Sequence, residues 1–266
     1  MQARCGDIEI AWYEVGRGEP LILIHGLADD HRAWRKVLPW LTMRHRVILY
    51  DFRGHGGTTL GQPDGTLRQL SADLVALIDA LAIDKATLVG FSLGGTIAMR
   101  TAIDRPERVE RLVAVATSSR VGRQAAEWYE QRARLVDSGS DDLVPTLEED
   151  AADVYGNAPA ELADGLAIRR QSTADPRGYG NACRAMARLN PEPLDPELAR
   201  ISAPTLVVAA DRDQHCPPRA AEIIAQAVAG ARLEIVEECG HPIPVEKPEQ
   251  LSRLILGAAA VSAPTG

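Results

Sequence analysis

The chain has 266 residues, of which 45% are hydrophobic and 25% are charged, proportions typical of a soluble globular protein and not of a disordered one. Its 29 basic and 37 acidic residues give a net charge of −8, which argues against nucleic acid as a partner. No run approaches the roughly 18 apolar residues of a membrane span, and the N-terminus lacks the apolar stretch of a secretory signal. We therefore expect a cytoplasmic protein that binds neither nucleic acid nor membranes.

Short apolar runs alternate with amphipathic stretches, which predicts a mostly parallel sheet covered by helices on both faces. The expected strands, most of them apolar throughout because both faces would be buried, are Ile8–Val15, Pro20–His25, Arg46–Tyr50, Ala86–Gly90, Leu112–Ala116, Thr205–Ala210 and Leu233–Val236. The expected helices between them are Ala33–Leu41, Leu70–Leu81, Leu93–Asp104, Arg219–Val228 and Pro248–Ala258. The tail 258–266 is expected to be frayed.

The alternation stops between about residues 120 and 200, where no β-rich run occurs. Helical periodicity there covers Gln124–Asp137, Ala160–Gln171 and Gly180–Leu189. The segment opens just after one core strand and closes just before the next, so it should cover the carboxyl ends of the strands, where open α/β sheets bind ligands. We therefore divide the chain into a core of residues 1–119 and 201–266 and a helical cap of residues 120–200.

The segment Gly90-Phe91-Ser92-Leu93-Gly94 matches G-x-S-x-G between a predicted strand and a predicted helix. A sharp turn at this junction requires small residues two before and two after the serine, because strand and helix pack closely there. Such a turn lifts the hydroxyl clear of the sheet and places it at a helix N-terminus, which favours developing negative charge. We predict that Ser92 is a nucleophile.

A serine hydroxyl needs an adjacent base at neutral pH, and on such an elbow the acid and then the histidine follow the serine in the chain. Of the six histidines, only His215 and His241 follow Ser92. His241 lies between the last predicted strand and the last predicted helix, in a loop that can reach the end of the sheet. We predict that His241 is the general base.

The acid is expected after the strand Thr205–Ala210, where Asp211 and Asp213 are both candidates. Asp213 has more reach toward a histidine because it lies further along the loop, so we favour it, and Asp211 then has a structural role. With His215 and Cys216 these residues could suggest a metal site, but no second ligand group with recognisable spacing accompanies them. We expect neither a metal nor a cofactor.

Acyl transfer passes through an oxyanion that preorganised N–H donors must stabilise. One donor should be the N–H of Leu93, directly after the nucleophile. The other should be the N–H of Leu27, because Gly26 permits a tight turn after the strand Pro20–His25. We expect His25 itself to hold that loop by a hydrogen bond.

Five motifs accumulate in order along the chain: H-G-L, D-F-R-G-H-G, G-F-S-L-G-G, D-R-D-Q-H-C-P and G-H-P-I-P-V-E-K-P. Through them the chain resembles the α/β-hydrolase superfamily over nearly its whole length. The resemblance implies an α/β-hydrolase fold, with a mostly parallel central sheet flanked by helices and a helical cap inserted after the sixth core strand. It also favours Asp213 as the acid, because the family spacing puts that acid four residues ahead of Pro217.

Three further segments, A-T-S-S-R-V-G, G-Y-G-N-A-C-R-A-M and I-S-A-P-T-L-V-V-A-A-D-R-D, are similar to the 3-oxoadipate enol-lactonase branch. The chain departs from that branch at Ala210, where glycine is frequent, and at Phe91-Ser92-Leu93, where Leu-Ser-Met is expected. Serine at the elbow argues against haloalkane dehalogenases and epoxide hydrolases, which use aspartate there.

We predict hydrolysis of a small-molecule carboxylic ester or lactone through an acyl-enzyme on Ser92. A carbon–carbon bond hydrolase or a cofactor-free perhydrolase could use the same triad, and a ligand-sensing protein could keep the fold without turnover. A homo-oligomer is also compatible with the sequence.

The cap should decide the substrate, and Trp128 is the candidate substrate-binding residue there. The cap carries many arginines and no lysine, and arginine binds a carboxylate bidentately while staying charged. We therefore expect at least one cap arginine to point toward Ser92 and acidic lactones to outcompete neutral esters of similar size. The alternative is that these arginines pair with aspartate and glutamate on the outer surface of the cap.

Overall fold

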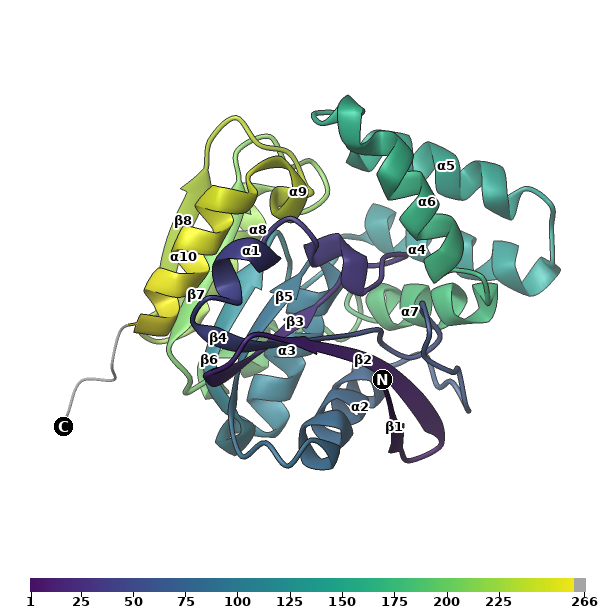
Figure 1. The fold of residues 1–266 in the computed structure, drawn as a ribbon. Helices are drawn as coiled ribbons and strands as arrows, with labels where there is room; N and C mark the ends of the chain where they lie inside the picture. The colour runs from purple at the N-terminus through teal and green to yellow at the C-terminus, as the bar shows by residue number, and fades with distance from the viewer. Residues whose placement is uncertain (261–266) are drawn as a thin grey trace.

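The computed structural model describes residues 1–260 and has an eight-stranded sheet at its centre (Figure 1). The strand order is β1-β2-β4-β3-β5-β6-β7-β8. β1 pairs antiparallel with β2 and β2 with β4, whereas all other neighbours are parallel, so the predicted mostly parallel sheet is confirmed. The strands are β1 Gln2–Cys5, β2 Ile8–Val15, β3 Glu19–Ile24, β4 His45–Tyr50, β5 Ala86–Phe91, β6 Val109–Val115, β7 Thr205–Ala210 and β8 Arg232–Val236.

Helices cover both faces of the sheet because alternate residues of each central strand point to opposite sides. Ile22 and Ile24 of β3 belong to the core that packs against α2 (Leu67–Ala80), α3 (Leu93–Asp104) and α8 (Pro218–Ala227). Leu21 and Leu23 belong to the core on the opposite face. That face is covered by η1 (His31–Trp34), α1 (Leu38–Leu41), α9 (Ile243–Glu246) and α10 (Pro248–Ala260).

The prediction of one continuous helix over Ala33–Leu41 is wrong. The segment holds the 3₁₀ turn η1 and then the short helix α1, in which Pro39 occupies the first turn. Proline lacks an N–H and its ring clashes with the carbonyl four residues earlier, so the helix cannot run through this position. The frayed tail is also wrong for residues 258–260, which belong to α10, and its remainder lies outside the described residues.

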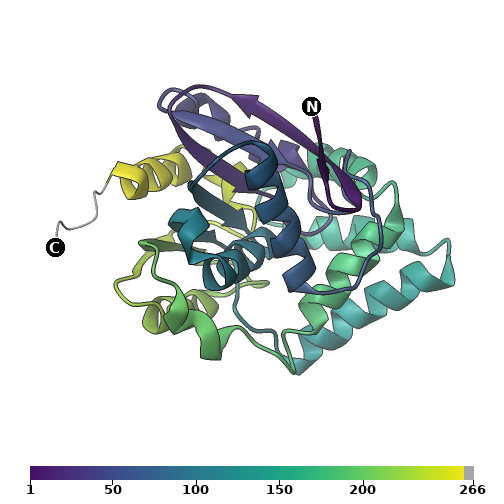
Figure 2. The same cartoon turned by 90° about the horizontal axis from the view of Figure 1, so that it is seen from below.

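Four helices between β6 and η4 (Asp195–Arg200) lie together beside the sheet, at the right in both views (Figures 1 and 2). They are α4 (Arg123–Ser138), α5 (Leu143–Val154), α6 (Leu162–Ser172) and α7 (Pro176–Ala187). We call them the cap helices, and their chain boundaries at 120 and 200 stay a prediction. Within residues 1–260, no helix combines the length and the apolar character needed to span a bilayer.

The cap helices contact the core where α7 meets the loop after β4. A Cβ added to Gly178 would lie 1.9 Å from the carbonyl oxygen of Gly54, so the two backbones touch and only glycine fits. This contact fixes the start of α7 against the core.

Candidate active site

Ser92 lies in a sharp turn between β5 and α3, at the carboxyl end of the sheet. Its φ of 53° and ψ of −122° are strained for a residue with a side chain. The turn depends on its glycines, because a Cβ on Gly90 would lie 2.2 Å from the carbonyl oxygen of Gly94, and one on Gly94 would lie 2.2 Å from that of Ile24. The sequence thus permits the turn that lifts the Ser92 hydroxyl out of the sheet.

A chain of two hydrogen bonds runs from Ser92 into the protein. Nε2 of His241 lies 3.1 Å from Oγ of Ser92, and Nδ1 of His241 lies 2.8 Å from Oδ2 of Asp213. Both His241 and Asp213 are buried. The three residues come from loops after β5, β7 and β8, which meet because the carboxyl ends of parallel strands lie at one edge of the sheet.

The second oxygen of Asp213 fixes the carboxylate in place. Oδ1 accepts the backbone N–H groups of His215 and Cys216, both at 2.9 Å. Asp211 is exposed and instead accepts the N–H of Cys239 at 3.0 Å, in the loop that carries His241. Of the two candidate acids, the structure therefore brings Asp213 to the histidine and gives Asp211 a contact that braces the loop.

The two predicted oxyanion donors come from different elements at the carboxyl end of the sheet. Leu93 begins α3, and Leu27 follows β3 in the loop that lines the same pocket as Ser92. Within the described part of the chain, neither N–H donates a hydrogen bond. His25 holds this loop, since its Nδ1 lies 2.8 Å from the carbonyl oxygen of Gly26 and its Nε2 accepts the N–H of Phe52 at 3.1 Å.

A pocket of about 400 Å³ opens above Ser92 between the sheet edge and the cap helices. The core side of the pocket includes Leu27, Asp29, Phe91, His215 and His241, and the cap side includes Gln124, Trp128, Tyr129, Asp150, Asp153, Val154 and Arg169. Trp128, the predicted substrate-binding residue, therefore lines the pocket. Its ring carries the guanidinium of Arg132 at 4.3 Å from the ring centroid.

Most cap arginines are paired with acidic residues. The pairs include Arg132–Asp150, Arg134–Glu130, Arg170–Glu148, Arg177–Asp175 and Arg184–Asp137. Arg169 is different because it is buried and lines the same pocket as Ser92. That a cap arginine points toward Ser92 stays a prediction.

For two pocket residues, Asp29 and His215, no functional role was predicted from the sequence. Burial raises the pKa of Asp29 to about 6. Burial also lowers the pKa of His215, whose Nε2 lies 3.3 Å from Asp153. The only signal for Asp29 was its place two residues after Leu27, and no periodicity shows where such a loop side chain points.

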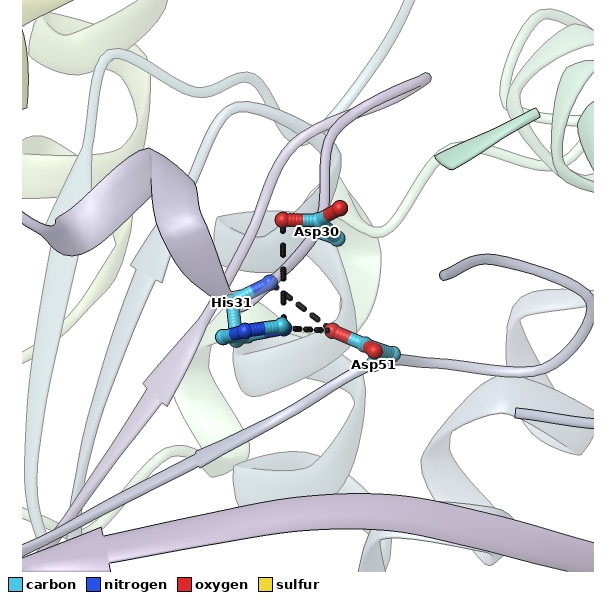
Figure 3. Close-up of side chains that lie close together, drawn as sticks. All are labelled: Asp30, His31 and Asp51. Carbon is cyan, nitrogen blue, oxygen red and sulfur yellow. Dashed lines mark hydrogen bonds and ion pairs between the residues drawn. The ribbon is translucent and has the colours of Figure 1, made fainter. Parts of the chain in front are cut away.

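Asp30, His31 and Asp51 form a cluster of possible metal ligands with their donor atoms within 4.8 Å of one another (Figure 3). Protein contacts already occupy these atoms. Asp30 binds the guanidinium of Arg32. Oδ1 of Asp51 accepts the backbone N–H of His31 at 2.8 Å and lies 2.8 Å from Nδ1 of the same residue. The cluster therefore braces the loops after β3 and β4.

Comparison with known proteins agrees with the fold described above. The sequence profile of the family described as "alpha/beta hydrolase fold" matches residues 19–248. The chain is 27% identical to 3-oxoadipate enol-lactonase 2 of Acinetobacter baylyi over 94% of this chain and 92% of the relative. It is 31% identical to the putative carbamate hydrolase RutD of Pseudomonas savastanoi over 89% of this chain and 92% of the relative.

A solved structure, the enol-lactonase from Burkholderia xenovorans, superposes with a TM-score of 0.88 at 25% identity, covering 98% of this chain and 100% of that one. The names of these relatives describe different reactions, since two are enol-lactonases and one is a putative carbamate hydrolase.

Proposed function

This chain belongs to the α/β-hydrolase fold family, and from that premise we propose that it is a serine hydrolase that cleaves a carboxylic ester or lactone. The observation that carries the proposal is the chain of hydrogen bonds from Ser92 through His241 to Asp213. Ser92 and His241 also line a pocket that could hold a substrate. A serine is activated when a histidine can accept its proton and an acid holds that histidine in the required tautomer.

In the first half of the reaction, Oγ of Ser92 attacks the acyl carbon while Nε2 of His241 accepts its proton. The N–H groups of Leu27 and Leu93 stabilise the negative charge on the carbonyl oxygen. His241 then donates the proton to the leaving alkoxide, and the acyl group stays on Ser92.

In the second half, water attacks the acyl-enzyme, with His241 again as the base. The tetrahedral intermediate collapses, Ser92 regains its proton and the free carboxylic acid leaves. Asp213 stays ionised throughout and stabilises the imidazolium that forms twice in each cycle.

The test of this proposal compares Ser92→Ala with Ser138→Ala, an exposed serine on the outer side of α4. With p-nitrophenyl esters and small lactones as substrates, Ser92→Ala should lower kcat by about 10³-fold or more, because triad members act as a unit. Ser138→Ala should behave as the wild type. A fluorophosphonate reagent should form its adduct on Ser92 by mass spectrometry. An active Ser92→Ala variant, or an adduct on another serine, would refute the proposal.

A carbon–carbon bond hydrolase with the same triad is the second candidate, because the fold supports both reactions. The substrate panel separates the two. Turnover of an ester or lactone with release of an alcohol supports the first reaction, whereas activity confined to a ketone with a cleavable carbon–carbon bond supports the second.

A further inference from the structure

Arg169, in the last turn of α6, is buried and only 7% exposed. Among residues 1–260, its Nε has no hydrogen-bond partner. No carboxylate of the described chain lies within 4.0 Å of its guanidinium nitrogens. An unpaired charge is costly to bury, and a ligand of opposite charge would offset that cost.

Asp29 is one of three carboxylates that share this pocket with Arg169. The residue is 9% exposed, and within residues 1–260 its carboxylate accepts no hydrogen bond. A Cβ added to Gly26 would lie 3.4 Å from Oδ2 of Asp29, so the carboxylate sits beside the loop of the proposed oxyanion donor Leu27.

The fold holds the two charges over the same part of the pocket. Oγ of Ser172 donates a hydrogen bond to the carbonyl oxygen of Asp29, which ties the end of α6 to the loop after β3. Arg169 lies three residues before Ser172, so it projects from the same side of the helix. The Arg169 charge acts on Asp29 and lowers its pKa, against the larger effect of burial.

We propose that Arg169 and Asp29 form a charge-selection site, in which Arg169 binds a carboxylate carried by the substrate and ionised Asp29 opposes that binding. The proposal rests on the proposed hydrolase function, because it assigns the substrate class of the same site. Arginine suits this role, since its planar fork binds a carboxylate through two hydrogen bonds and stays charged.

Several charged groups face Asp29 from the surrounding elements. Arg169 of α6, Arg35 after η1 and His241 after β8 favour its ionised form, whereas the neighbouring Asp30 opposes it. Tyr155 at the end of α5 also faces it and stays neutral, because burial raises the pKa of its hydroxyl.

The other two carboxylates of the pocket are engaged elsewhere. Asp150 pairs with Arg132, and Asp153 contacts His215. In the described part of the chain the Asp29 carboxylate has no such partner, so its protonation changes the net charge near Arg169.

The experiment uses pairs of p-nitrophenyl esters of matched length, one neutral and one ending in a carboxylate, over a series of chain lengths. The quantity measured is the selectivity ratio, the kcat/KM of the anionic ester divided by that of the neutral ester. Groups that act on the ester carbonyl affect both substrates equally and cancel in this ratio. Arg169→Gln should lower the ratio by about tenfold or more, as expected for a lost charge-assisted hydrogen bond.

Arg170→Gln is the matched control, since it removes the same charge from the next residue of α6, where Arg170 is exposed and pairs with Glu148. Its selectivity ratio should equal that of the wild type. Arg169→Lys keeps the charge without the fork and should restore part of the ratio. A ratio within about twofold of the wild type in Arg169→Gln overturns the proposal.

Asp29→Asn tests the opposing role of Asp29, and it should change the selectivity ratio in the opposite direction to Arg169→Gln. About 1.5 pH units above the pKa of Asp29, this variant should raise the ratio by about fivefold, because a like charge near the bound carboxylate is removed. Damage to the fold would not produce such a gain. In the wild type the ratio should rise as the pH falls through about 6, and in Asp29→Asn this rise should disappear. A pH-independent ratio in the wild type overturns the opposing role of Asp29.

Failure of this proposal is distinguishable from failure of the proposed function. If the wild type hydrolyses neither ester, the hydrolase function is wrong. If it hydrolyses the neutral ester and the ratio does not depend on Arg169, only the charge-selection site is wrong.

Discussion

Asp213 differs from Asp211 in what its carboxylate touches. Asp213 contacts His241 with one oxygen and two backbone N–H groups with the other, whereas Asp211 accepts the backbone N–H of Cys239. Only Asp213 can therefore fix the tautomer of His241 and stabilise its charged form.

Replacement by asparagine separates these roles. Asp213→Asn should lower kcat by about 10³- to 10⁴-fold, because an amide cannot hold the histidine in the same tautomer. Asp211→Asn should keep kcat within a few fold of the wild type. Steady-state kinetics on one p-nitrophenyl ester checks both, and a larger loss in Asp211→Asn would reverse the assignment.

The ionised form of buried Asp29 lowers the stability of the folded protein, as the raised pKa of this carboxyl indicates. A carboxyl whose pKa is raised by burial binds its proton more tightly in the folded state than in the unfolded state. Its contribution to stability is therefore present at low pH and is lost as the pH rises through about 6.

Asp29→Asn should accordingly stabilise the protein near neutral pH by about 1 to 3 kcal/mol, since one pKa unit corresponds to about 1.4 kcal/mol. At pH about 4 the difference from the wild type should vanish, because Asp29 is then protonated in the folded state. Urea denaturation at the two pH values measures this. A variant that is less stable than the wild type at neutral pH would contradict the expected sign.

The sequence could predict the meeting of Ser92, His241 and Asp213, because strand ends and chain order determine which loops meet. It could not identify Asp29 and Arg169 individually. The direction of Arg169 depends on how α6 rests on the core, and in particular on the bond from Ser172 to the loop after β3.

At the scale of elements, short apolar runs, either alternating or continuous, located seven of the eight strands, and each missed element has a local cause. β1 was missed because it has only four residues, Gln2–Cys5, and two of them, Gln2 and Arg4, are polar and exposed at the edge of the sheet. α5 was missed because Pro145 interrupts its periodicity, yet proline is tolerated there since the first helical turn has no internal N–H partner to lose.

The contact between α7 and the core predicts the effect of a single methyl group. Gly178→Ala should lower the free energy of unfolding by about 2 to 4 kcal/mol, because its Cβ would overlap the backbone of Gly54. Gly257→Ala is the control, since it is exposed in α10 with no atom within 4 Å of the added Cβ. It should stabilise by about 0.5 to 1 kcal/mol. Equal stabilities of the two variants would contradict the tight contact.

At the scale of the whole molecule, burial is uneven between the core and the cap helices. α3 buries eleven of its 12 residues, whereas α5 buries only Leu147 and Ala151 of its 12. Helices with few buried side chains open locally at low cost.

Hydrogen exchange should therefore rank these elements. Amides of α5 should exchange at least about 10³-fold faster than those of α3, because opening α5 disrupts few apolar contacts. Mass spectrometry of peptides from both helices provides the measurement, and equal protection of the two would show that the cap helices and the core open as one unit.

Two hydrogen bonds connect the end of α6, a cap helix, with loops of the core. Oγ of Ser172 donates to the carbonyl oxygen of Asp29, and the N–H of Gly56 donates to the carbonyl oxygen of Ser172 at 3.0 Å. A cap transplanted from a relative would bring new pocket residues, but without a hydroxyl at this position it would also release the loop that carries Leu27. If the proposed function is correct, we expect Ser172, which lies outside the proposed triad, to limit changes of substrate. Variants that exchange α6 should recover activity only when the serine is kept.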